Sequence, residues 1–158
     1  MIYRKATLKD LEGICQLRAQ LAHDPTEKFA TEYAPYNAKP DRAWIQKCLR
    51  SKQRVILIAE DKEGICAHSF VVIETVSARA KVYYTYRKKA VLAHLYTAIN
   101  KRHQGIGINL LKYTLNYLKK QAVEFVDLDC YIGNKNAEAL YKKTGFKDVF
   151  VRKRFTLK

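Results

Sequence analysis

Residues 101–111, KRHQGIGINLL, place two glycines one position apart at the start of an apolar segment. Glycine is unfavourable inside a helix or strand, so this pair needs a physical reason. The first N–H groups of a helix have no partner within the helix, and together they form an anion site. Gly105 and Gly107 lack a Cβ atom, which lets a phosphate approach the main chain. With Lys101 and Arg102 in front, the stretch predicts a diphosphate-binding turn between a strand and a helix.

A tight turn whose glycines only relieve crowding is the alternative interpretation of this short motif. The chain contains neither the G-x-x-x-x-G-K-[ST] loop of ATP and GTP sites nor the third glycine of a dinucleotide fingerprint. ATP, GTP and NAD are therefore not the expected ligands.

The chain has 158 residues, 48% of them hydrophobic and 28% charged, which predicts a single globular domain over residues 1–158. No apolar run approaches the ~18 residues of a membrane span, and the charged start MIYRKATLKD is unlike a signal peptide. We therefore expect a cytoplasmic protein without a membrane segment. The four cysteines and four histidines lack metal-ligand spacing, so no metal is expected.

Basic residues dominate the charge. Thirty Lys and Arg residues oppose fifteen Asp and Glu residues, and the net charge is +15. No acidic residue lies between Glu74 and Glu124, a stretch that includes the glycine motif. Such a charge predicts an anionic partner. On charge alone, a nucleic acid, a phosphorylated cofactor and an acidic membrane surface all remain open.

The hydrophobic pattern predicts alternating strands and helices. Strands are expected at 2–6, 54–60, 65–76, between 82 and 98, at 124–131, and once or twice within 146–157. Helices are expected from a Thr7–Asp10 cap to about His23, from a cap at Asp41, from 107 to about 121, and from a cap at Asn134 to Gly145. This order predicts an α/β (α+β) domain whose mixed sheet has helices on both faces.

The segment from Leu95 to Phe146 resembles the GNAT superfamily of acetyl-CoA-dependent N-acyltransferases. RHQGIG (102–107) matches the phosphate-binding pattern of that family, and NKNAEALYKKTGF (134–146) is similar to its Asn-x-x-Ala-x-x-x-Tyr helix. One helix and one strand separate the two motifs, as the family requires. The resemblance implies a mostly antiparallel central sheet of six to seven strands, splayed between its two central strands.

The resemblance also implies a site for acetyl-CoA as co-substrate. A strand bulge near residues 96–99 would free main-chain groups for the pantetheine arm, and one N–H would polarise the thioester carbonyl. The implied cofactor-binding residues are Tyr96, Thr97, Ala98, Ile99, Arg102, His103, Gln104, Gly105, Ile106, Gly107, Ile108, Asn134 and Tyr141.

Two side chains are candidate catalytic residues. By resemblance, the phenol of Tyr141 protonates the departing thiolate, which its ordinary pKa of ~10 allows; a packed core tyrosine is the alternative. His94 is the candidate general base, because it is the only residue of KAVLAHLYT that titrates near neutrality. A packing role for His94, and a base at Glu74, Asp127 or Asp129 acting through water, are the alternatives.

The expected reaction is direct transfer of the acetyl group to a primary amine, because no cysteine lies in a recognisable nucleophile motif. The acceptor, whether a small molecule, a peptide, a protein N-terminus or a lysine, is not identified, and a homodimer is left open. The loop 24–41 offers aromatic and acidic side chains for it: Phe29, Tyr33, Tyr36, Glu27 and Glu32.

Two other functions compete with this interpretation. A basic nucleic-acid-binding domain is suggested by the charge and by YYTYRKK (83–89), in which aromatic and cationic residues alternate. A solvated hairpin face explains the same stretch, and no RRM or KH signature is present, so nucleic acid is not the expected partner. A GNAT-like module that binds acyl-CoA without acetylating an amine is the third alternative, and the Tyr141 motif counts against it.

Overall fold

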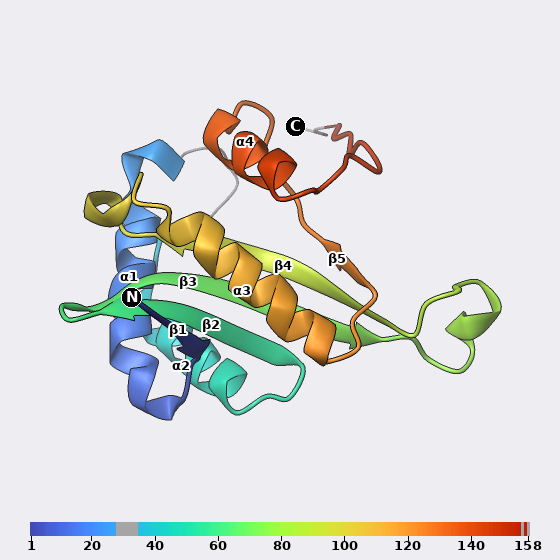
Figure 1. The fold of residues 1–158 in the computed structure, drawn as a ribbon, viewed down its shortest axis with the longest axis horizontal. Helices are drawn as coiled ribbons and strands as arrows, with labels where there is room; N and C mark the ends of the chain where they lie inside the picture. The colour runs from blue at the N-terminus through green and yellow to red at the C-terminus, as the bar shows by residue number, and fades with distance from the viewer. Residues whose placement is uncertain (28–34, 156, 158) are drawn as a thin grey trace.

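The computed structural model describes residues 1–27, 35–155 and 157, which form one sheet with helices packed on both sides (Figure 1). The strands are β1 (Ile2–Lys5), β2 (Arg54–Asp61), β3 (Gly64–Thr75), β4 (Lys88–Thr97) and β5 (Phe125–Asp127), adjacent in this order. The first four are antiparallel, and β5 runs parallel to β4. The helices are α1 (Leu11–His23), α2 (Ala38–Leu49), α3 (Ile106–Lys120) and α4 (Lys135–Lys143).

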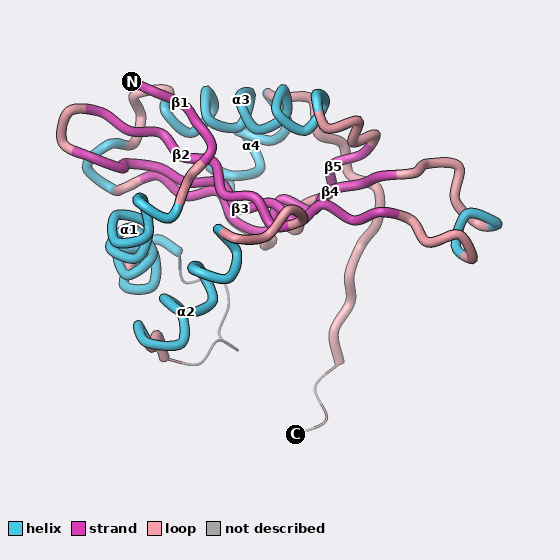
Figure 2. Tube along the Cα trace, turned by 90° about the horizontal axis from the view of Figure 1, so that it is seen from below, coloured by secondary structure: helices cyan, strands magenta, loops and turns pink. Residues whose placement is uncertain are grey.

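Alternation along β2 divides the core between the two faces of the sheet. Ile56 and Ile58 pack with residues of α1 and α2, such as Ile14 and Ile45. Val55, Leu57 and Ala59 point the opposite way and pack against Ile106 and Leu110 of α3. Figure 2 shows the same division, with α1 and α2 on one side of the sheet and α3 and α4 on the other. The prediction of helices on both faces is therefore confirmed.

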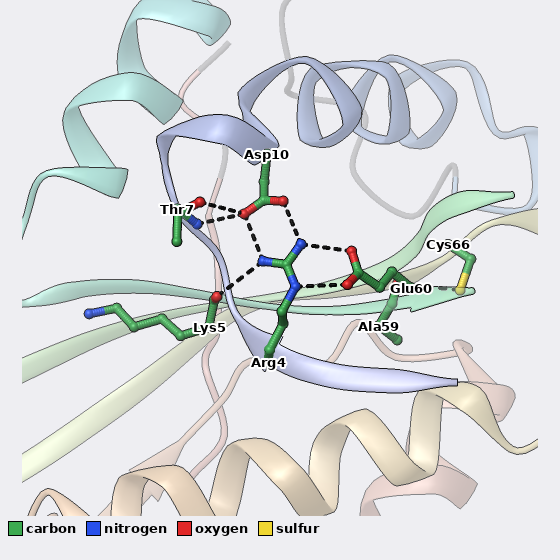
Figure 3. Close-up of polar contacts among 7 residues, drawn as sticks. All are labelled: Arg4, Lys5, Thr7, Asp10, Ala59, Glu60 and Cys66. Atoms are coloured by element: carbon green, nitrogen blue, oxygen red, sulfur yellow. Dashed lines mark hydrogen bonds and ion pairs between the residues drawn. The ribbon is translucent and has the colours of Figure 1, made fainter. Parts of the chain in front are cut away.

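The N-terminal strand is fixed by a partly buried ionic cluster (Figure 3). The guanidinium of Arg4 donates to both oxygens of Asp10, at 2.6 and 2.8 Å, and to both oxygens of Glu60, at 2.7 and 2.8 Å. The N–H of Thr7 also donates to Asp10, at 2.7 Å, which bears out the predicted cap. The bonds from Arg4 lower the pKa of Asp10 to about 2. The cluster therefore joins β1, β2 and the start of α1.

The sheet has five strands in the described residues, fewer than the predicted six to seven. The strand predicted at 124–131 is confined to Phe125–Asp127, and residues 146–155 contain no strand. An alternating apolar pattern forms a strand only where a neighbouring strand can pair with its backbone. Because β5 has only three residues, it offers little edge for residues 146–155 to pair with. Exposed apolar side chains in this segment follow from that, including Val149 (77% exposed) and Phe155 (84%).

The second helix begins earlier than predicted. Its cap is Asn37, whose side chain accepts from the N–H of Lys39 at 3.2 Å, and not Asp41. Asp41 lies within α2 and accepts two bonds from Nε of Arg18 and one from Nη2, at 2.8–3.0 Å. Asp41, which the local pattern assigned to a helix cap, therefore forms a tertiary ion pair with Arg18.

Candidate active site

The glycine turn leaves the start of α3 open. Gly105 is the N-cap with φ 76°, a left-handed conformation that favours glycine, and no side chain of the described residues caps this end. The first helical bond runs from the N–H of Asn109 to the carbonyl of Gly105, at 3.1 Å. His103, Gln104 and Gly105 are exposed to solvent. An uncapped helix start of this kind is the arrangement that the predicted anion site requires.

Gly107 has a different role from Gly105. A Cβ atom at Gly107 would lie 3.2 Å from Oγ1 of Thr97, closer than most side chains tolerate. The second glycine therefore lets α3 pack directly on the end of β4. This contact places the helix start beside the edge of the sheet.

That edge of the sheet is open beside the turn. β4 pairs with β5 only from Lys89 to Val91, so from Leu92 to Thr97 no described strand lies on this side. The N–H of Ala98 bonds to Cys66 of β3 at 2.9 Å. Because bonding directions alternate along an antiparallel strand, the main-chain groups of Leu95 and Thr97 point toward the opening. An opening is thus present between β4 and β5, although β5 is the outermost of the described strands and the prediction placed the splay between two central strands.

The bulge that accompanies this opening lies earlier in β4 than predicted. Phe70 and Val71 are adjacent in β3, but they pair with His94 and Leu92. The extra residue is therefore Ala93, and the bulge predicted near 96–99 was misplaced. The position of a bulge depends on the register with β3, which the sequence of β4 does not specify. For the same reason, Leu95 was not among the residues predicted to bind the cofactor.

Both basic residues in front of the glycines are engaged by carboxylates. Nζ of Lys101 lies 2.8 Å from Oδ2 of Asp61 and 2.7 Å from Oε2 of Glu63, in the β2–β3 turn. Nη2 of Arg102 lies 2.5 Å from Oδ2 of Asp24, at the end of α1. Lys101 and Arg102 therefore anchor the turn to the rest of the fold, while residues 103–105 are exposed to solvent.

Asp24 is the centre of a network that the sequence did not reveal. Its side chain is fully buried and also accepts from the hydroxyl of Tyr96 at 3.2 Å and from Thr26 at 2.6 Å. Burial acts to raise the pKa of Asp24, but the bonds from Thr26 and the charge of Arg102 outweigh it and the pKa is lowered. The guanidinium of Arg102 also lies over the ring of Tyr96 and donates to the carbonyl of Thr97 at 3.1 Å.

The local sequence does contain a weak signal for this residue. Asp24 opens an Asp-Pro-Thr turn directly after α1, a typical position for an aspartate that bonds the backbone two residues later. The partner Arg102 lies 78 residues away, so the pairing itself was beyond reach of the local pattern.

Two histidines lie on the face covered by α1 and α2. The ring of His94 is 6.1 Å from the ring of Phe70, and that of His68 is 6.1 Å from Tyr96. Burial, followed by the charge of Arg18, lowers the pKa of His94 to about 4 and that of His68 to about 3. Both rings are therefore neutral at pH 7. His68 was not predicted, and in the described residues its two ring nitrogens have no hydrogen-bond partner.

Tyr141 and Asn134 belong to α4. The Asn134 side chain accepts from the N–H of Ala137 at 3.2 Å, which confirms the predicted cap. Tyr141 packs at 5.7 Å from the ring of Phe146, in a cluster that includes Leu111 of α3. Tyr141 thus lies on the α3 side of the sheet and His94 on the other, and the β4–β5 opening separates them.

Part of the predicted acceptor loop lies outside the described residues, namely Phe29, Glu32 and Tyr33, and so does the side chain of Glu27. Tyr36 is described, and its hydroxyl donates to Oδ2 of Asp41 at 3.3 Å.

Across the described residues, no helix has the length and apolar character needed to cross a membrane. The four cysteines are unpaired, and burial raises the pKa of each thiol.

Several solved structures that share this fold are named as acetyltransferases. The chain resembles a solved predicted acetyltransferase of Clostridium acetobutylicum bound to acetyl-CoA, at 23% identity and TM-score 0.75, over 99% of this chain and 96% of that one. A variant of the BH1408 protein of Bacillus halodurans is similar at 22% identity and TM-score 0.85, over 99% of each chain.

A curated relative from Arabidopsis thaliana, GCN5-related N-acetyltransferase 6, chloroplastic, is 38% identical over 58 residues. That match spans 37% of this chain and only 20% of the relative. The Acetyltransferase (GNAT) family model matches residues 19–146, which is most of the chain and includes both motifs. The chain therefore belongs to the GNAT acetyltransferase family.

Proposed function

We propose that this protein is an N-acetyltransferase that moves the acetyl group of acetyl-CoA directly to a primary amine. The observation that carries the proposal is the uncapped start of α3 beside the unpaired edge of β4. Free amides at a helix start suit the diphosphate of coenzyme A, and a free strand edge suits the amides of its pantetheine arm.

The residues proposed to hold the cofactor come from three segments. The turn at 102–108 would bind the diphosphate through its main chain, and the end of β4, with Leu95 added to the predicted 96–99, would bind the pantetheine arm. Tyr141 of α4 completes the set, and Asn134, also expected from the sequence to bind the cofactor, is proposed to act mainly as the cap that positions α4. An N–H of the free β4 edge would stabilise the negative charge that develops on the thioester oxygen.

We assign Tyr141 as the acid that protonates the departing thiolate. Because Tyr141 lies on the α3 side of the β4–β5 opening, we expect the amine to approach from the opposite side, where His94 lies. The raised pKa of all four thiols supports direct transfer, since a cysteine nucleophile requires a thiolate. The free thiols also accord with the predicted cytoplasmic location.

His94 is proposed to accept the proton of the attacking amine. With a pKa of about 4, the ring is unprotonated throughout the neutral range, but it is a weak base. Its role therefore begins after the carbon–nitrogen bond forms, when the nitrogen is positively charged and gives up its proton readily. Free amine from solution starts the reaction.

Charges on the same face favour a cationic amine as acceptor. Glu74 pairs with Lys89 across β3 and β4, as Phe70 pairs with His94, so both pairs share a face. Nζ of Lys89 lies 3.5 Å from Glu74 and 3.9 Å from Asp127. Two carboxylates and one lysine give this face a local negative charge on a molecule of net charge +15.

The experiment that tests the proposal is turnover of acetyl-CoA with a panel of amines: polyamines, lysine peptides, peptide N-termini and aminoglycosides. Thiol release that requires both the enzyme and an amine supports it. No turnover with any amine, together with normal CoA binding, would leave a binding module instead.

Tyr141→Phe isolates the acid. We expect kcat to fall at least ~10-fold with little change in CoA affinity, since only the phenolic proton is removed. Tyr117→Phe on α3 is the matched control and should leave kcat unchanged. An unchanged kcat for Tyr141→Phe would contradict the assignment.

His94→Gln tests the base in the same assay. Its kcat should fall, and the loss should be greatest for the amine with the highest pKa. His23→Gln is the control, because His23 is exposed and its Nδ1 lies 2.7 Å from the carbonyl of Ala19. Equal rates for the two variants would remove His94 from the mechanism.

A further inference from the structure

The connection between β3 and β4 projects well beyond the body of the protein, and we call residues 76–87 the arm (Figures 1 and 2). Its last strand-like bond runs from the N–H of Val76 to the carbonyl of Arg87, at 2.9 Å. Glu124 fixes its base by accepting from the N–H of Arg87 at 2.7 Å. The arm is thus an ordered extension of the sheet.

Apolar and aromatic side chains at the tip of the arm are largely exposed, although the ring of Tyr84 lies 5.2 Å from that of Tyr86. Val82 is 81% exposed, Tyr83 82% and Tyr84 50%. Adjacent exposed apolar and aromatic side chains of this kind can form a contact surface. This exposure agrees with both interpretations of YYTYRKK, a solvated hairpin face and a stacking surface for bases.

The arm carries only positive charge. Arg79, Lys81 and Arg87 are exposed, and the arm lies within the stretch that lacks any acidic residue. At its base, Tyr84 and Tyr86 line an open hollow of ≈ 320 Å³ together with Glu74 and Lys89, which pair with each other, so the positive charge available to a partner is that of the arm itself. Cations and aromatic rings therefore lie close together along residues 79–87.

We propose that the arm binds single-stranded nucleic acid, by stacking bases on its tyrosines and pairing phosphates with its cations. This combination is the usual basis of sequence-tolerant single-strand binding. An acidic membrane would also attract the charge, but insertion favours Trp, Phe or Leu, whereas three of the four large aromatic and apolar side chains here carry a phenolic hydroxyl. The inference replaces the sequence-based expectation that nucleic acid is not a partner.

The arm is separate from the proposed acetyl-CoA site. It joins the start of β4, whereas the glycine turn follows the end of β4, ten residues and about 30 Å away at the usual rise per residue. Arm variants should therefore bind CoA and acetylate a small amine normally. The two proposals can fail independently.

The test is fluorescence anisotropy of the full chain with a labelled oligo(U) of about 12 nucleotides, at about 50 and about 200 mM salt. Tyr83→Ser with Tyr84→Ser should raise Kd about 5- to 50-fold and leave the salt dependence unchanged. Arg79→Gln with Lys81→Gln should lower the slope of log K against log salt by about 1.4. Lys47→Gln with Arg50→Gln, exposed on α2, removes the same charge elsewhere and should have less effect on both.

Three results would overturn the proposal. The first is an unchanged Kd for the tyrosine variant with an unchanged unfolding midpoint. The second is an equal loss for the α2 control, which would assign binding to net charge alone. The third is arm-dependent binding to phosphatidylserine vesicles with none to oligo(U), which would make the partner a membrane.

Discussion

Helices α3 and α4 each follow a glycine of positive φ, Gly105 (76°) and Gly133 (93°). They differ in whether a side chain caps the free N–H groups of the first turn. The start of α4 is closed by Asn134, whose side chain accepts from Ala137. The start of α3 has no such cap. The bond between Arg102, just before the glycine turn, and Asp24 fixes its position instead. A helix start that is positioned without being capped can accept an external anion. The predictions below disturb each start in turn.

The largest effect is expected from the support behind α3. Asp24→Asn leaves the charge of Arg102 without its buried partner, so the free energy of unfolding should fall by about 2–3 kcal/mol. Asp129→Asn is the control, because Asp129 pairs with Arg152 at 3.2 Å where both side chains are more than 60% exposed. The control should change stability by less than about 0.5 kcal/mol in denaturant unfolding.

The pH dependence checks the same interaction. The pKa of Asp24 is lower in the folded protein than its ordinary value near 4, so its contribution is present above that value and is lost as the pH falls through the folded pKa. The stability difference between wild type and Asp24→Asn should therefore narrow below about pH 4. A difference that stays constant to pH 2 would contradict the role of the carboxylate.

The two glycines offer a matched pair of substitutions. Gly105→Ala and Gly133→Ala each force an alanine into the left-handed region, with no atom closer than 3.8 Å to the new Cβ, and each should lose about 1–2 kcal/mol of stability. Only Gly105→Ala should weaken CoA binding in calorimetry, by about 10- to 100-fold, because its Cβ lies where the phosphates approach. Equal CoA affinities for the two variants would remove the diphosphate from α3.

Adding a negative charge at each helix start tests further whether α3, and not α4, binds the diphosphate. Gln104→Glu should weaken CoA binding about 3- to 10-fold at low salt, and less at high salt, through repulsion of the diphosphate. Asn134→Asp changes the net charge equally but retains the cap, so CoA affinity should stay within about 2-fold of wild type. A stronger effect at Asn134 would reverse the comparison.

The smallest effect concerns the cap itself. Asn134→Ala removes the bond to the N–H of Ala137, and the protein should lose about 1 kcal/mol of stability. CoA affinity should change less than about 3-fold. A larger loss of affinity would mean that Asn134 contacts the cofactor as well as capping the helix.

Local chemistry explains why both motif regions could be predicted. A glycine before an apolar helical pattern, and an asparagine three residues before Ala137, specify their turns through neighbours in the chain. The order of strands and helices, and the division of the core along β2, follow from hydrophobic periods of two and 3.6 residues. Where the signal needed a partner strand, as in residues 146–155, the prediction was wrong.

The sequence by itself determined the order of elements, the open helix start after Gly105 and the family of the fold, because these depend on contacts within a few residues. Only the tertiary structure decided that Arg102 bonds to Asp24, that the extra residue of β4 is Ala93, and that the tyrosines at the tip of the arm are exposed. Each depends on the register or proximity of segments far apart in the chain, and side-chain identity along one segment does not fix which distant group it meets.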